Sequence, residues 1–231
     1  DALVEQAVSR LGIQTFAIAY PGQEGGARLA DRFWTLVEAA GGRVTAVESY
    51  DPAATDFRET ARRLKGSHYR ANPPGDVDTK LSYLPDRKKP QISSPQTELK
   101  PGVDFQAIFV PDNYKRATMV APGFLFEEIN LGGHLPADEF PPVTLMGGSA
   151  FNHPDLVARG GKYVNGTMLV DGLFLEGKDA VTQSFRKGYR KAHSADPTLL
   201  EATAFDAMRF VMQLLAEGAS TRRELTERLH M

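Results

Sequence analysis

Four short polar stretches of the chain contain the side chains whose types could do chemistry. Each stretch follows an apolar run or a glycine turn, and together they carry carboxylate, hydroxyl and amide groups. Such groups orient small polar molecules through hydrogen bonds, and a pair of carboxylates can also transfer protons or bind a cation. The candidates are Tyr20, Gln23, Glu24, Asp112, Tyr114, Ser149, Asn152 and Asp171.

The spacing of the candidates matches no catalytic motif. Ser149 lacks the G-x-S-x-G pattern of a nucleophile elbow, and no triad can be assigned to it. The turn over residues 22–26 lacks the lysine and the glycine register of a phosphate loop. Asp112 and Asp171 could pair for acid–base work or bind a cation, although solvated turn aspartates are the commoner case. We therefore predict that the protein is not an enzyme and uses no cofactor.

The composition of the 231-residue chain argues against several other classes. The five histidines lack metal-ligand spacing and there is no cysteine, so we expect no metal site and no thiol chemistry. A formal net charge of -2 without a basic stripe gives no reason to expect a nucleic-acid partner. No apolar run approaches the ~20 residues of a membrane span, so the chain is not predicted to cross a bilayer.

The elements that position the first candidates form one repeating unit. The apolar run Ile13–Tyr20 predicts a buried strand that ends in a turn. Apolar residues spaced by three and four from Ala27 to Ala40 predict an amphipathic helix, which the following Gly41-Gly42 ends. Residues 44–50 then alternate like a second strand. A strand, a helix and a strand in this order predict parallel pairing with a right-handed crossover.

Strands and helices continue to alternate through the rest of the chain. Residues 105–110 and 143–146 read as buried strands, and residues 163–175 read as an extended run. Pro122 should kink or split its helix, and the helix over 198–216 has a broad apolar side to bury. The fold class is therefore α/β with a mainly parallel sheet covered by helices on both faces, a three-layer sandwich. The helices are predicted at residues 3–11, 55–65, 114–129, 153–159, 181–193, 198–216 and after residue 220.

Residues 66–104 differ from the rest of the chain. The stretch is rich in proline, contains a DRKKP cluster and has almost no apolar periodicity. It is too long for an ordinary connection between a helix and a strand, so we predict an insertion on the surface. A solvated excursion and an arm that docks a partner are both compatible with its composition.

The predicted sheet places the candidate residues at one edge. In parallel α/β sheets, ligands bind beyond the carboxyl ends of the strands, where backbone amides and helix N-termini converge. The loops at those ends are residues 20–25, 111–114, 147–152 and 171–172. We therefore expect the candidates to line a common rim and to bind a small molecule there.

Four segments of the chain resemble the leucine/isoleucine/valine-binding family of type I periplasmic binding proteins. The opening of that family's second lobe is similar to AYPGQEGGARLADRFWTLVEAAGGRVTAVESYDPAATDFRETARRLK. Its next strand and helix resemble DFQAIFVPDNYKRATMVAP, and its late strand with the following turn resembles PPVTLMGGSAFNHPDLVARGGKYVNGTMLVDGLF. Its closing helix pair is similar to FRKGYRKAHSADPTLLEATAFDAMRFVMQLL. The forms VPDNYKRATMVAP and VDGLF also resemble a branch near the lipoprotein activators of penicillin-binding proteins.

The resemblance implies a type I periplasmic-binding-protein fold of two lobes, with the first lobe incomplete in this sequence. Residues 1–170 resemble the second lobe. Residues 171–231 resemble the segment that returns to the first lobe, together with that lobe's C-terminal helices. The opening strands of the first lobe would precede Asp1. Either they were removed by trimming, or they are present in a longer protein.

The function that the resemblance implies is the binding of a solute without chemistry. Two lobes would close by a hinge over a small polar ligand, such as an amino acid or a related compound. The protein would be an ABC-transporter receptor in the periplasm with a membrane permease as its partner, and a missing upstream segment could carry a lipid anchor. The alternative is a non-catalytic module of the same fold that regulates cell-wall synthesis by contacting a synthase.

The ligand chemistry of the family carries over only in part. Amino-acid-binding members place an acidic side chain after the late strand, where this chain has Ser149. An aromatic residue usually closes over the ligand from the turn after the lobe's first strand, a position that Tyr20 or Gln23 would fill. Glu24 and Asp112 would favour a cationic or hydroxylated ligand if they face the cleft, and would otherwise only cap turns. A neutral solute, a peptidoglycan fragment and no small ligand at all therefore stay open.

Overall fold

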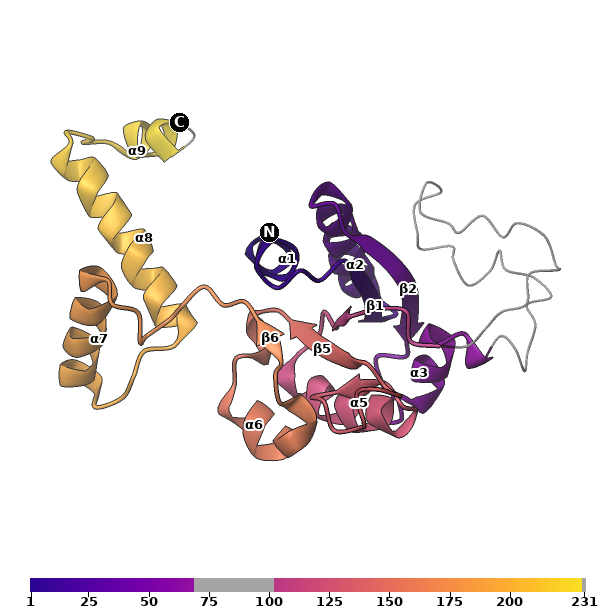
Figure 1. Cartoon of the computed structure of the whole chain (residues 1–231). Coiled ribbons are helices and arrows are strands. Elements are labelled where there is room, and N and C mark those ends of the chain that lie inside the picture. The colour runs from indigo at the N-terminus through magenta and orange to yellow at the C-terminus, as the bar shows by residue number, and fades with distance from the viewer. Residues whose placement is uncertain (69–101, 230–231) are drawn as a thin grey trace. The chain divides into compact units, whose positions relative to one another are not determined.

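The computed structural model describes residues 1–68 and 102–229 of the chain (Figure 1). The chain falls into two compact units, Asp1–Val170 and Asp171–Met231. Most of the predicted insertion over residues 66–104 lies outside the described residues. The first unit contains a sheet with helices, and the described part of the second unit contains helices.

The first unit is built on a parallel sheet. The strand order is β2-β1-β3-β5-β4, and β6 pairs with the carboxyl end of β5. Every pairing between the described strands is parallel. The prediction of an α/β fold with a parallel sheet is therefore confirmed. The strands are β1 (Thr15–Pro21), β2 (Arg43–Tyr50), β3 (Ala107–Phe109), β4 (Asn130–Leu131), β5 (Pro142–Gly147) and β6 (Met168–Leu169).

Helices cover both faces of this sheet (Figure 1). One face carries α1 (Ala2–Glu5), the π-helical turn η1 (Gln6–Arg10) and α2 (Glu24–Ala39). The other face carries α3 (Arg58–Leu64), α5 (Tyr114–Phe126) and α6 (Pro154–Gly160). Two short 3-10 turns, η3 (Ser149–Phe151) and η4 (Gly161–Val164), flank α6. The result is the three-layer sandwich that the sequence predicts.

The core follows the alternation of side chains along β1. Phe16 and Ile18 are fully buried on the face that α2 covers. Ala17 and Ala19 are fully buried on the opposite face, in the cluster that contains Phe124 of α5. Burial of one large apolar side chain contributes about 1.5–3 kcal/mol to folding, so these faces bind both helical layers to the sheet.

Two local expectations need correction. The sequence predicts that Pro122 kinks or splits its helix, and the split is wrong, because α5 continues through Pro122 to Phe126. An internal proline costs roughly 3 kcal/mol, and the burial of the adjacent residues Ala121 and Phe124 offsets this. Residues 163–175 are not an extended run, because η4 and the two-residue strand β6 occupy part of them. Gly166 has a φ of 69°, which turns the chain between these elements.

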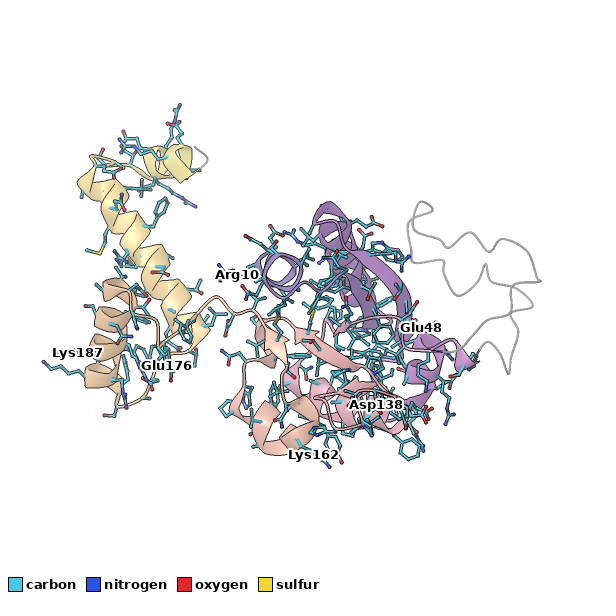
Figure 2. All side chains as sticks on the ribbon, viewed as in Figure 1. Arg10, Glu48, Asp138, Lys162, Glu176 and Lys187 are labelled. Carbon is cyan, nitrogen blue, oxygen red and sulfur yellow. The ribbon has the colours of Figure 1, made fainter. Side chains whose placement is uncertain are left out.

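The second unit contains α7 (Ala180–His193), α8 (Leu199–Ala216) and α9 (Arg222–Leu229). Phe185 of α7 stacks on Phe205 of α8, with ring centroids 4.4 Å apart. The turn between the two helices is held by Arg186, whose Nε donates to Asp196 at 2.9 Å. The polar side of α7 faces solvent, where Lys187 points away from the unit (Figure 2).

The apolar side of α8 is largely exposed, which contradicts the predicted broad buried face. Within the described residues, α8 buries only Ala202 and Leu214. Leu200, Met208 and Met212 are 76%, 61% and 61% exposed. The expectation failed because α7 and α9 are too small to cover so wide an apolar side. No described helix is both long enough and apolar enough to span a bilayer.

The two sides of the segment over residues 69–101 are already joined. The N–H of Gly102 donates to the carbonyl oxygen of Lys65 at 2.9 Å. The end of α3 and the chain that leads into β3 are therefore in direct contact. We predict that a short Gly-Ser linker in place of residues 69–101 changes the melting temperature by less than about 4 °C, because mainly the loop-closure entropy changes. Differential scanning calorimetry measures this, and loss of cooperative unfolding would contradict it.

Acid should weaken the helices of the second unit through carboxylates at their N-termini. The N–H of Thr182 lowers the pKa of Asp179, and a hydrogen bond from Thr198 lowers the pKa of Glu201. Such groups stabilise the fold above their ordinary pKa values of 3.8 and 4.5 and lose this effect as the pH falls below them.

We therefore predict that amide hydrogens of α7 exchange faster, relative to the intrinsic rate, as the pH falls below about 4. Asp179→Asn keeps a capping oxygen but does not titrate, so it should reduce this acid sensitivity. Hydrogen exchange of residues 180–193 across pH measures both chains. Equal acid sensitivity of the native chain and the variant would contradict the assignment to Asp179.

Candidate functional site

Three of the four predicted loops leave the sheet at the same edge. β1, β3 and β5 are adjacent and parallel, so their carboxyl ends lie side by side. The loops over residues 20–25, 111–114 and 147–152 begin at these ends. The fourth loop, at Asp171, belongs to the second unit. We call the edge formed by the first three loops the rim.

Tyr20, Gln23 and Glu24 differ in what they can offer a ligand. Tyr20 is only 4% exposed and belongs to the core cluster that contains Phe33. Its burial is an argument against a role as the aromatic residue that closes over a ligand. Gln23 is the N-cap of α2 but makes no side-chain cap hydrogen bond, and both Gln23 and Glu24 are exposed. All three assignments as ligand contacts stay predictions.

Asp112 is bonded to protein groups on both carboxylate oxygens. Its Oδ2 accepts a hydrogen bond from the hydroxyl of Tyr50 at 2.9 Å, and its Oδ1 accepts from the N–H of Asn113 at 2.7 Å. The Nε of Arg116 lies 4.0 Å from Oδ2. Burial, and then the charge of Asp112, raise the pKa of Tyr50 well above its ordinary value of 10.0, so the phenol stays a donor. The negative charge of Asp112 is therefore balanced inside the protein.

Arg116 fastens two neighbouring loops to each other. Its guanidinium donates to the carbonyl oxygens of Pro52 and Ala54, which lie between β2 and α3. Arg116 itself lies in the first turn of α5, next to the loop that carries Asp112. Together with the bond from Tyr50, these contacts fix the loop after β2 to the loop after β3. The expectation that Asp112 attracts a cationic ligand loses support, since its charge serves this joint.

Tyr114 and His153 form a stacked pair on the rim. Their ring centroids are 3.9 Å apart and their planes differ by 4°. Tyr114 is the first residue of α5, and His153 is the N-cap of α6. The Nδ1 of His153 accepts a hydrogen bond from the N–H of Asp155 at 3.1 Å. The pair thereby links the N-termini of two helices at the edge where the sequence predicts a ligand.

Ser149 and Asn152 are exposed on the loop after β5. Phe151 anchors this loop, because its side chain is completely buried in the core. Only glycine fits at position 147, because a Cβ there would collide with the ring of Phe151. The base of the loop is therefore fixed, while Ser149 and Asn152 face outward. Their roles as ligand contacts stay predictions.

Asp171 caps its own turn, because its Oδ1 accepts a hydrogen bond from the N–H of Gly172 at 2.6 Å. It is the first residue of the second unit, so its pairing with Asp112 and its contact with a ligand stay predictions. In the described part of the chain, no group of three His, Asp or Glu side chains is placed to hold a metal ion.

Sequence reasoning missed three residues that shape the rim: Tyr50, Arg116 and His153. A signal for His153 was present, because a proline at the first helical position, here Pro154, marks the preceding residue as the N-cap. Tyr50 and Arg116 had no local signal. The bond from Tyr50 reaches a residue 62 positions away in the chain.

Removal of the Tyr50 hydroxyl should loosen the rim. Tyr50→Phe leaves the part-buried carboxylate of Asp112 with one donor fewer, which should cost about 1–3 kcal/mol of unfolding free energy. Tyr163→Phe is the matched control in the same unit and should cost much less, because Tyr163 makes no side-chain hydrogen bond within the described residues. Urea unfolding followed by the fluorescence of Trp34 compares the two variants. Equal losses would contradict the role of the Tyr50 bond.

No protein-family model matches the chain, and no curated protein matches it significantly. Solved structures do match. A protein from Rhodospirillum rubrum assigned to branched-chain amino acid ABC transport has 20% identity and a TM-score of 0.66, over 98% of this chain and 53% of its own. A leucine-binding protein from Thermotoga maritima has 16% identity and a TM-score of 0.60, over 98% and 51%. A solute-binding protein of an ABC transporter from R. palustris, in complex with benzoate, has 14% identity and a TM-score of 0.55, over 96% and 49%.

These likenesses concern the fold, since the identities are low. The matched proteins include leucine-binding and other branched-chain amino acid proteins of ABC transporters. The chain spans about half the length of the structures that it matches. It therefore has the fold of type I periplasmic binding proteins, over about half of their length.

Proposed function

We propose that the chain is the ligand-binding part of a solute-binding protein that serves an ABC transporter. The observation that carries this proposal is the rim: polar loops from three adjacent parallel strands, on a fold that ABC-transporter solute-binding proteins share. The protein holds a small polar ligand, catalyses no reaction and needs no cofactor. It works in the periplasm with a membrane permease as its partner.

The two units correspond to parts of two lobes in this proposal. The first unit is the second lobe, and the second unit supplies helices to the first lobe. The exposed apolar side of α8 supports this, because an apolar helix side normally packs against another layer. In the complete protein, that layer is the sheet of the first lobe. Ligand capture is then closure of the two lobes by a hinge.

An amino acid or a related compound is the proposed ligand. The rim offers hydroxyl and amide groups at Ser149 and Asn152, which can orient a polar solute. It offers no acidic side chain at Ser149, and the carboxylate of Asp112 is taken up by Tyr50 and its neighbours. A standard ammonium partner is therefore missing from these two positions, which favours compounds related to amino acids over the amino acids themselves.

The lack of an ammonium partner at Ser149 and Asp112 also favours an alternative function. A module with this fold that holds no amino acid could regulate cell-wall synthesis by contacting a synthase. The segment over residues 66–104 gives such a module extra chain for a partner, and the N–H of Gly102 within it bonds back to the carbonyl oxygen of Lys65 before it. A lipid anchor upstream of Asp1 belongs to this alternative.

A thermal-shift screen with amino acids, organic acids, sugars and muropeptides separates the two functions. A ligand at 100 times its dissociation constant stabilises the fold by about 2.7 kcal/mol, so the melting temperature should rise by several degrees. Ser149→Ala should reduce the shift, whereas Ser184→Ala, an exposed serine on α7, should not. No shift with any compound, together with retention of a cell-wall synthase in a pull-down, would favour the alternative.

A further inference from the structure

The hydrogen bond to α6 fixes the proton of His153 on one ring nitrogen. The N–H of Asp155 is a donor, so the Nδ1 that it contacts at 3.1 Å must accept and carries no proton. The proton of the neutral ring is therefore on Nε2, which becomes a hydrogen-bond donor. His153 is exposed, and Nε2 makes no hydrogen bond to any other described residue.

The position of this donor is also fixed. Tyr114 covers one face of the imidazole at a centroid distance of 3.9 Å, which holds the plane of the ring, and a half-turn within that plane would break the hydrogen bond from Asp155 to Nδ1. The Nζ of Lys115 lies 5.9 Å from the centroid of the Tyr114 ring. Because His153 occupies one face of the Tyr114 ring, Lys115 lies over the other face, and the imidazole alone supplies the donor on its own side.

The carboxylates near this pair have partners of their own. Asp112 binds the Tyr50 hydroxyl, and Asp155 forms an ion pair with Arg159 at 3.1 Å. Glu24 is exposed, but it begins α2, which packs on the opposite face of the sheet from α5 and α6. Asp112 and Asp155 are therefore engaged by other protein groups and not by the Nε2–H of His153.

We propose that His153 is a specificity-determining residue that binds a carboxylate group of the ligand through its Nε2–H. This deepens the proposed function, on which it rests, by naming the ligand class: an organic acid held by its carboxylate on this lobe. An amine without a carboxylate is not a ligand. A charge-assisted hydrogen bond is worth about 1.5–3 kcal/mol, which corresponds to at least about a tenfold preference.

Three matched probes test the ligand class on the chain as it is. Isocaproate has the carbon skeleton and carboxylate of leucine without the amine, isoamylamine keeps the amine without the carboxylate, and leucine has both. NMR titration of the labelled chain should show isocaproate binding at least about tenfold more tightly than isoamylamine, with shifts at His153 and Tyr114. Equal affinity for these two probes, or shifts only at other residues, would overturn the proposal.

Two variants separate the role of His153 in ligand binding from its role as the N-cap of α6. Serine and aspartate are both good N-cap residues, so His153→Ser and His153→Asp should keep α6 folded. His153→Ser should weaken isocaproate binding at least about tenfold, and His153→Asp at least as much, because its charge repels a carboxylate. His193→Ser, at the end of α7, is the matched control and should leave the affinity for isocaproate unchanged. Unchanged isocaproate affinity in His153→Ser, or an equal loss in His193→Ser, would overturn the proposal.

The position of the ring proton gives a test that needs no variant. Nitrogen chemical shifts of the native chain at neutral pH should report the tautomer with the proton on Nε2 of His153, and a proton on Nδ1 would overturn the proposal. Leucine binding that His153→Ser leaves unchanged would overturn this inference while the proposed function stands. So would a sugar that binds when all three probes fail. If no compound in the thermal-shift screen raised the melting temperature, both the proposed function and the proposed role of His153 would be overturned.

Discussion

The first unit depends on the burial of β1 on both faces. Its alternating side chains send phenylalanine and isoleucine toward α2, and alanines toward α3 and α5. The small residues leave room for Phe57 and Phe124, which the helices bring to the other face. This division lets one central strand hold two helical layers. The rim inherits its rigidity from that arrangement, because its loops start from the strands that the core holds in place.

The charged groups of Asp112 and Arg116 at the rim interact mainly with other groups of the protein. The carboxylate of Asp112 and the guanidinium of Arg116 hold loops together, so the groups that look most reactive in the sequence are structural. The exposed side chains of the rim loops and of His153 next to them include hydroxyl, amide and imidazole groups, together with the carboxylate of Glu24. The fold that carries this surface is shared with solute-binding proteins of ABC transporters.

Local patterns predicted the elements better than the contacts between them. The alternation in β1 and the spacing of apolar residues in α2 gave both elements, because each reflects a single periodic burial pattern. The common rim followed from parallel pairing alone. The partner of Asp112 could not be predicted, because Tyr50 comes from a distant strand and meets it only after folding. Pro122 was misread because its local cost is visible in the sequence, whereas the burial that offsets it is not.

Gly147 has a consequence for how proteins of this kind can diverge. The position admits no side chain, since Phe151 fills the space beside it, whereas Ser149 and Ala150 just beyond are exposed. Substitution is thus restricted at the base of the loop and free at its tip. Descendants of this sequence could therefore change the side chains at the tip of the loop while the scaffold beneath changes little.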